Sequence, residues 1–362
     1  MRHINCKRSR EPSRLRRQTG VTVIELMVAV VIGAVLIFGA TQVYVDSRNT
    51  FNSNENVARL QETARYALSI LEPDIRLSNY WGLMAGAEGI SGIGGALATI
   101  CGNTYAEDLG TNVQGTNDSY SLGCAAVGAG AMPNADTLTI RHASSGQSVI
   151  TGTMPASGPL RVCTTRSGGI LTTDTTAGIC LTAFPAAEIH DVVVNAYYVD
   201  QDSDQQAGLP SLRRYFLTYT GGAPDFSDAE ITPGVEDMQV QYGVDTSGGT
   251  GTASGAATKY LDAGATLTGL LTSPTLPAQI VSVRIWLLVR ADTPEVGFTD
   301  NRTYAYGDRL AANGTTGDLT AVADNLKAYT PATGTDSGPN DRRHFRRVLI
   351  SRTIQLRNAL GT

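Results

Sequence analysis

Residues 14–45 read RLRRQTGVTVIELMVAVVIGAVLIFGATQVYV, a short basic segment followed by a long apolar run. Within residues 21–45 the polar interruptions are Thr22, Glu25, Thr41 and Gln42. As an α-helix this segment would rise roughly 37 Å, which is enough to cross the ~30 Å hydrocarbon core of a bilayer with some tilt. The sequence therefore predicts one membrane-spanning helix close to the N-terminus.

Charge is distributed unevenly on the two sides of this helix. Residues 1–20 carry seven basic side chains and one acidic side chain, whereas residues 21–362 carry 21 basic and 32 acidic side chains. The positive-inside rule predicts that the basic leader stays in the cytoplasm and that everything after Val45 is exported. An acidic exported body repels phosphate backbones, so general nucleic-acid binding is not expected.

Cysteine usage agrees with export, because Cys6 lies in the leader and the other four cysteines lie in the part that can be oxidised. Four cysteines allow three pairings. Pairing neighbours in sequence, Cys101 with Cys124 and Cys163 with Cys180, closes the shortest loops and is favoured. A zinc site is the alternative, although the sequence offers neither C-x-x-C nor a nearby histidine spacing for it.

The junction before the apolar run carries a recognisable motif. A secretory signal peptide would have its cleavage site after the apolar region. Here residues 16–27, RRQTGVTVIELM, resemble the leader junction of type IV prepilins and pseudopilins. In that family a prepilin peptidase cleaves after the glycine and methylates the new amino terminus. The resemblance implies cleavage between Gly20 and Val21, with Val21 in place of the more usual aromatic first residue, and it makes Glu25 the family's glutamate at the fifth mature position.

A carboxylate such as Glu25 costs several kcal/mol inside a membrane unless it finds a partner. The α-amino group released at Val21 of a neighbouring subunit could neutralise it in a filament. That pairing would set the axial register and make joining the filament preferable to remaining alone in lipid. The alternative is an acid near the membrane surface, where water reaches it.

Beyond Val45 the apolar residues continue on one helical face until Pro73. A helix from about residue 22 to residue 71 would be roughly 75 Å long. We therefore divide the chain into a leader (1–20), a transmembrane half-helix (21–45), an amphipathic periplasmic half-helix (46–72) and a body. The residues of the amphipathic face are Val57, Leu60, Ala64, Ala67, Leu68 and Leu71.

The body divides by composition. Residues 73–187 are rich in Gly, Ala, Ser and Thr, hold the exported cysteines, and are interpreted as a long insertion with a few strands, or as a partly disordered segment. Residues 188–362 show the period-two alternation of half-buried strands and are interpreted as a sheet. The predicted class is α+β, a pilin-like long N-terminal helix packed on a mostly antiparallel sheet. The best strand candidates are 136–142, 160–163, 192–199, 212–219, 238–244, 281–289 and 348–356.

Three stretches of the second half resemble the PilW family of minor pilins: VEDMQVQY (235–242), VSVRIWLLVR (281–290) and TIQLRN (353–358). The resemblance implies a minor pilin of the inner membrane, with its body in the periplasm, that primes a type IV pilus or sits at its tip. Its implied partners are other minor pilins, the major pilin, a tip adhesin, the prepilin peptidase and membrane lipid. A minor pseudopilin of a type II secretion system is the alternative, followed by a membrane-tethered adhesin or binding module.

Other candidate sites are weaker. Asp200, Asp202 and Asp204 form a D-x-D-x-D that could bind Ca²⁺ as a loose loop, or could be a solvated hairpin tip. No other cofactor is indicated. The sequence contains no H-E-x-x-H, G-x-S-x-G or Walker pattern, so we do not expect an enzyme. Arginines near the C-terminus, which could suit an acidic partner or DNA, are expected instead to form surface ion pairs or to protect a sheet edge. They are Arg342, Arg343, Arg346, Arg347, Arg352 and Arg357.

Overall fold

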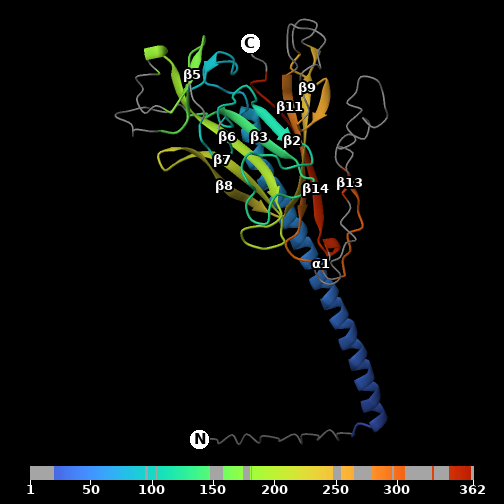
Figure 1. The fold of residues 1–362 in the computed structure, drawn as a ribbon. Helices are drawn as coiled ribbons and strands as arrows, with labels where there is room; N and C mark the ends of the chain where they lie inside the picture. Colours follow the sequence, from blue (N-terminus) through green and yellow to red (C-terminus); the bar gives the residue numbers. More distant parts are fainter. Residues whose placement is uncertain are drawn as a thin grey trace, which may run out of the picture. The chain divides into compact units, whose positions relative to one another are not determined.

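The computed structural model describes residues 20–93, 97–102, 104–146, 158–173, 180, 182–247, 254–264, 279–295, 297–305, 328–329 and 342–359. The chain forms two compact units, Met1–Asn54 and Glu55–Thr362, and each is described by itself. Helix α1 (Val23–Leu77) begins in the first unit and ends in the second (Figure 1). The predicted α+β class is confirmed.

The larger sheet contains eight strands among the described residues, in the order β1-β5-β4-β6-β3-β2, and β6 also pairs with β7, which pairs with β8. All of these pairs are antiparallel except β1 with β5. The strands are β1 (Ile90–Ser91), β2 (Val113–Thr116), β3 (Thr137–Ala143), β4 (Arg161–Thr164), β5 (Gly169–Thr172), β6 (Glu188–Asp200), β7 (Ser211–Thr220) and β8 (Ala223–Pro233).

A second, antiparallel sheet has the order β10-β9-β11-β14 in the described part of the chain, and β12 pairs with β13 separately. Every strand predicted from the sequence is present with small shifts at its ends, whereas the remaining strands, of which β8 is the longest, were not predicted. The strands are β9 (Val235–Asp245), β10 (Lys259–Asp262), β11 (Gln279–Arg290), β12 (Tyr304–Ala305), β13 (Ala328–Tyr329) and β14 (Arg347–Gln355), with a short 3-10 helix η4 (Arg342–His344) before β14.

The main core lies where the second half of α1 meets one face of both sheets (Figure 1). The helix contributes Leu60, Ala64, Ala67, Leu71 and Ile75, all of them buried, at a spacing of three or four residues that places them on one face. The sheets contribute the side chains of alternate strand residues that point towards the helix. The strand residues include Leu138, Ile140, Tyr197, Met238, Val240, Val283, Ile285 and Leu287.

A second core covers the opposite face of the larger sheet. Loops and strands of the segment 73–187 pack there against alternate residues of β6, so this segment joins the same sheet as residues 188–233. Within the described residues, disulfides join Cys101 to Cys124 and Cys163 to Cys180, the pairing favoured above. Members of this outer core include Trp81, Leu109, Cys101, Cys124, Val194, Tyr198 and Phe226.

Helix α1 does not end before Pro73, as the sequence indicated, but continues to Leu77 with the proline inside it. Pro73 has no N–H to donate to the preceding turn. The last turn is held instead by Asp74, which is 9% exposed and accepts three hydrogen bonds from the larger sheet. Tertiary anchoring therefore compensates the local break.

The Asp74 contacts form a closed network. Its Oδ1 accepts from His142 Nε2 (2.8 Å) and Asn195 Nδ2 (2.9 Å), and its Oδ2 accepts from the Tyr197 hydroxyl (2.9 Å). His142 Nδ1 faces the carbonyl oxygen of Ala143 at 2.7 Å, so both nitrogens of the ring face oxygen atoms of the protein. Burial, and after it the nearby Asp74, raises the pKa of Tyr197 well above its ordinary value, so its hydroxyl remains a donor.

We expect Asp74→Ala to lower the free energy of unfolding by about 3 to 5 kcal/mol, because the change leaves a buried imidazole, amide and hydroxyl without their common acceptor. Urea unfolding of the full chain in detergent, followed by near-UV circular dichroism, measures this. Glu62→Ala removes an exposed acid from the same helix and should change stability by less than about 0.5 kcal/mol. Equal effects of the two changes would contradict the anchoring role of Asp74.

Asp136 joins the two sheets. Its N–H donates to Met238 O (2.9 Å), its Oδ2 accepts from Val240 N–H (2.7 Å), and its Oδ1 accepts from Asp118 N–H (2.9 Å). The residue is 1% exposed, and burial raises the pKa of its carboxyl to about 8. The start of β3 is thereby attached to β9 through a carboxyl group that is mainly protonated at neutral pH.

This pKa predicts a pH dependence of stability. An unfolded aspartate titrates near pH ~3.9, so the folded protein holds the proton more tightly, and the stability present below that pH is lost as the pH rises towards about 8. In Asp136→Asn the decline between these pH values should be smaller than in the parent chain. Urea midpoints measured across the range compare the two slopes, and an unchanged slope would contradict the assignment to Asp136.

The chain's C-terminal residues return to the end of α1. Arg357 N–H donates to Arg76 O (3.4 Å), and the Asn79 side-chain amide donates to Asn358 O (2.9 Å). The Asn358 amide in turn faces Ser78 O at 3.5 Å. The TIQLRN stretch therefore ends by hydrogen bonding to the last turn of α1 and to the two residues that follow it.

Among the C-terminal arginines, which were expected to form ion pairs at the surface, Arg347 is an exception. Arg347 is buried, and its guanidinium pairs with Glu236 and, at 3.4 Å, with Asp300. Arg346 pairs with Glu295, and Arg352 lies 3.4 Å from Glu72. β14 is an edge strand of its sheet within the described part, so the expected position at an edge holds for this segment.

Candidate processing and assembly site

The predicted processing residues lie immediately before α1. Gly20, Val21 and Thr22 precede the helix, and Val21 is 69% exposed. Thr22 caps the helix, because its Oγ1 accepts the N–H of Glu25 (3.3 Å) and its carbonyl accepts the N–H of Leu26 (3.1 Å). The sequence analysis missed this cap, although T-x-x-E at residues 22–25 is its signature.

Glu25 lies in the first turn of α1, where the helix dipole favours a negative charge. Within the described residues its carboxylate makes no ion pair. Glu25 therefore lies four residues after Val21, and among the described residues its carboxylate is available to a group from another molecule.

The first half of α1 has the properties of a membrane span. It is long and apolar enough to cross a bilayer, and its most apolar window is not buried by the described residues. Large apolar side chains are openly exposed along it, including Ile24 and Phe38 at 75% each. Such a surface needs lipid or other helices to cover it.

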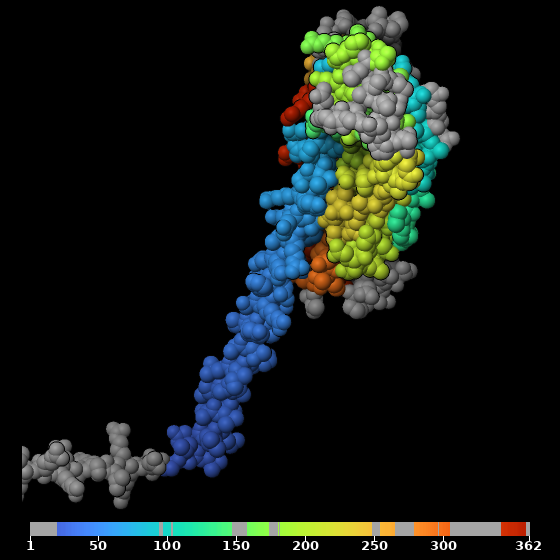
Figure 2. All heavy atoms as spheres, turned by 90° about the vertical axis from the view of Figure 1, so that its left-hand side faces the viewer, coloured from blue at the N-terminus to red at the C-terminus, as the bar shows by residue number. Residues whose placement is uncertain are grey.

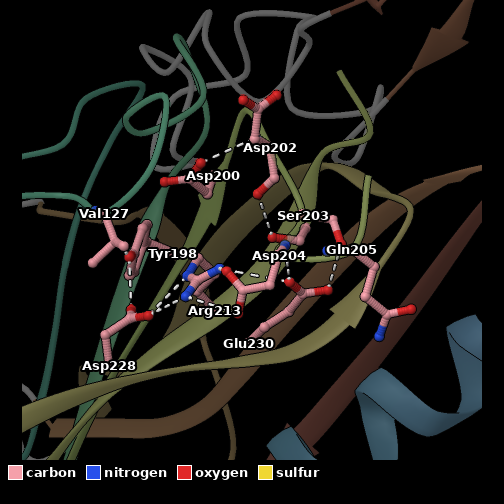
Figure 3. Close-up of polar contacts among 11 residues, drawn as sticks. Val127, Tyr198, Asp200, Asp202, Ser203, Asp204, Gln205, Arg213, Asp228 and Glu230 are labelled. Atoms are coloured by element: carbon pink, nitrogen blue, oxygen red, sulfur yellow. Dashed lines mark hydrogen bonds and ion pairs between the residues drawn. The ribbon is translucent and has the colours of Figure 1, made fainter. Parts of the chain in front are cut away.

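The acidic turn between β6 and β7 is organised around an arginine (Figure 3). Arg213 donates to the Asp204 carboxylate (2.7 and 3.4 Å) and to Asp228. Asp228 also accepts from the Tyr198 hydroxyl (2.7 Å), and Glu230 accepts from the Ser203 hydroxyl (2.8 Å). The positive charge that Asp204 and Asp228 share is therefore the guanidinium of Arg213.

The three aspartates predicted as a loose calcium loop are not brought together. Asp204 faces Arg213, Asp202 accepts the N–H of Gly208 (2.6 Å), and Asp200 is buried and accepts the N–H of Asp202 (3.0 Å). Burial raises the pKa of Asp200, which disfavours the ionised form that Ca²⁺ requires. Across the described ranges no group of three His, Cys, Asp or Glu residues could hold a metal ion, so the geometry does not support the calcium interpretation.

An exposed apolar helix with a capped N-terminus, whose second half packs on mostly antiparallel sheets in a body with two disulfides, is a pilin-like fold. Residues 15–41 match the family described as "Prokaryotic N-terminal methylation motif", and residues 196–358 match "Type IV Pilus-assembly protein W". The chain thus carries a region similar to the PilW type of pilus-assembly proteins behind an N-terminal methylation motif. Its methylation motif is that of a prepilin-peptidase substrate, and neither family is an enzyme family.

Among solved structures, the chain is similar to the type IV-like pilin TTHA1219 from Thermus thermophilus. The identity is 13%, the match covers 83% of this chain and 99% of that chain, and the TM-score is 0.37. At this TM-score the likeness carries no weight for the fold or the function. No curated protein matched the chain.

Proposed function

We propose that the chain is a minor pilin that primes assembly of a type IV pilus or sits at its tip. The supporting observation is that one chain combines the N-terminal methylation motif (15–41) with the PilW region (196–358). The body is large, and a second core on the outer sheet face adds to its bulk. Such a body suits a position occupied by few copies better than a filament wall of many stacked copies.

In this proposal the leader is cytoplasmic, residues 21–45 cross the inner membrane, and the body lies in the periplasm. The prepilin peptidase cleaves between Gly20 and Val21 and methylates Val21. Glu25 then pairs with the amino terminus of a neighbouring subunit, because an unpaired carboxylate in lipid costs several kcal/mol. Other minor pilins, the major pilin and a tip adhesin are the partners.

The test is purification of the tagged full chain from cross-linked membranes, followed by mass spectrometry of its N-terminus and of the co-purifying proteins. We expect an N-methylated Val21 and minor pilins of a pilus system. An uncut leader, or a start at another residue, would contradict the processing scheme. Co-purification of type II secretion pseudopilins instead would assign the chain to a secretion system.

A further inference from the structure

Strand β8 is an edge strand whose second side is open. It pairs with β7 through a hairpin closed by Gly221 and Gly222, both at positive φ. In the described part of the chain no backbone group of β8 between Ser227 and Ile231 bonds to anything beyond β7. Figure 2 shows the region of β7 and β8, in yellow to olive, uncovered beside the blue helix.

The first part of this edge is already covered. The Asp225 Oδ1 accepts the N–H of Phe226 (2.8 Å) and that of Ile100 (3.3 Å). Phe226 N–H therefore turns away from β7, and because alternate residues of an antiparallel strand point their N–H and C=O to the same side, those of Asp228 and Glu230 also turn outward. We call residues 227–231 the open edge.

The open edge is held rigidly by its own side chains. Asp228 bonds to Arg213 and Tyr198, and Glu230 accepts from the Ser203 hydroxyl and from the N–H of Asp204 (2.6 Å). These contacts fix the strand from the face of the sheet and leave its outward backbone groups available. A partner strand would meet a pre-ordered template, which lowers the entropy cost of binding.

The open edge carries no lysine or proline that would block pairing, and its irregularity, a bulge at Ile231, lies at its last residue. Natural edge strands are blocked by lysines, prolines or bulges. The other long edge strand, β14, carries exposed Arg352. In β8 the prolines, Pro224 and Pro233, stand at the two ends and no basic residue lies between them. The open edge is thus suited to accept another strand.

A groove of about 330 Å³ continues from the end of β8. Thr232 and Pro233 line one side, and Leu60 and Tyr66 of α1 line the other. Tyr66 is 49% exposed, and Glu62 at the rim makes no ion pair among the described residues. An extended segment on the open edge could place an apolar side chain in the groove and a basic side chain against Glu62.

Two copies of this chain do not fit together through their β8 edges by a two-fold axis. Ser227, near the start of β8, pairs through Phe216 with Asn195, and Asn195 bonds to Asp74 near the end of α1. Pro233, at the end of β8, lines the same groove as Asn56, which is earlier in α1. β8 therefore runs antiparallel to α1. Two β8 strands related by a two-fold axis would be antiparallel and would direct the two α1 helices in opposite directions, which subunits anchored in one membrane cannot adopt.

We propose that the open edge of β8 binds an extended segment of a different pilin-class subunit by strand addition, with a basic residue of that segment against Glu62. Main-chain hydrogen bonds to Asp228 and Glu230 supply affinity, and the groove beside Tyr66 supplies selectivity. The inference rests on the proposed function, because that function supplies a second pilin-class subunit in the same membrane.

Hydrogen–deuterium exchange on the full chain in detergent, alone and in complex with its co-purified minor pilins, tests the proposal. Amides of Asp228 and Glu230 should exchange about tenfold more slowly in the complex, the effect of roughly 1.4 kcal/mol of added protection. Amides of β14 should not change. A complex that forms without protection of Asp228 and Glu230 overturns strand addition and leaves the proposed function standing, whereas absence of any pilin-class complex overturns both.

A matched pair of variants tests the same edge. Ala229→Lys places a charge on the open edge and should reduce recovery of the partner by about tenfold. Ser351→Lys places the same charge on the exposed edge of β14 and should leave recovery unchanged. Equal recovery with both variants, each with parental thermal stability, would argue against the edge, and if Ala229→Lys does not fold, the exchange measurement decides.

Discussion

Gly20→Ala is expected to leave essentially the whole population with its leader attached. The reason lies outside the chain: an added Cβ at Gly20 would have no heavy atom within 4 Å, and the residue is not held at a positive φ. The described structure therefore tolerates alanine there. The requirement for glycine comes from the peptidase, which in this family cleaves after that residue.

The measurement is the mass of the chain recovered from membranes, which separates the cut and uncut forms. Gly33→Ala is the matched control, because its added Cβ would also meet nothing within 4 Å and it lies inside α1, thirteen residues after Gly20. The control should be cut normally. Normal cutting of Gly20→Ala would contradict the assignment of the cleavage site.

Glu25→Ala is expected to leave a chain that is cut correctly but excluded from filaments. Without the carboxylate, the neighbour's amino terminus has no negative charge with which to pair. Because such an interaction is worth several kcal/mol, its loss should reduce incorporation by tenfold or more. Quantitative immunoblotting of sheared filaments against membrane fractions measures the loss.

Glu25→Gln distinguishes this role from the cap seen in the structure. Glutamine keeps the Thr22 cap, in which residue 25 takes part through its backbone N–H, but it has no charge. If the charge is what matters, Glu25→Gln should fail to assemble like Glu25→Ala, and Glu25→Asp should recover in part. Normal incorporation of Glu25→Gln would contradict the role assigned to the charge of Glu25.

The sequence was sufficient where a signal is local and periodic. The alternation of residues 281–289 predicted β11, and the helical spacing of Leu60, Ala64, Ala67 and Leu71 identified the buried face of α1. Short loops between neighbouring cysteines favoured the disulfides that the structure contains. Each of these features depends on residues close together in the chain.

The sequence analysis did not predict features that depend on contacts between residues far apart in the chain. The end of α1 depends on His142, Asn195 and Tyr197, which no local pattern connects to Asp74. The acidic turn resembled a metal loop because Arg213, its actual cation, lies on the next strand.

Strand β8 was missed for a similar reason. Its residues 223–233 lack clear alternation, and the strand exists because Gly221 and Gly222 fold it back on β7. The glycine pair was the available signal, since such dipeptides mark tight hairpins. The candidate site was predictable in its residues, whereas the cap at Thr22 required the T-x-x-E pattern to be recognised.

The contact between Asn358 and the end of α1 has a consequence for the timing of biogenesis. During translation the helix emerges first, and the hydrogen bonds beyond its end wait for Asn358, which lies 279 positions after Asn79. The body therefore cannot close at this point until the chain has been made as far as this asparagine. A chain truncated just before it would lack these hydrogen bonds.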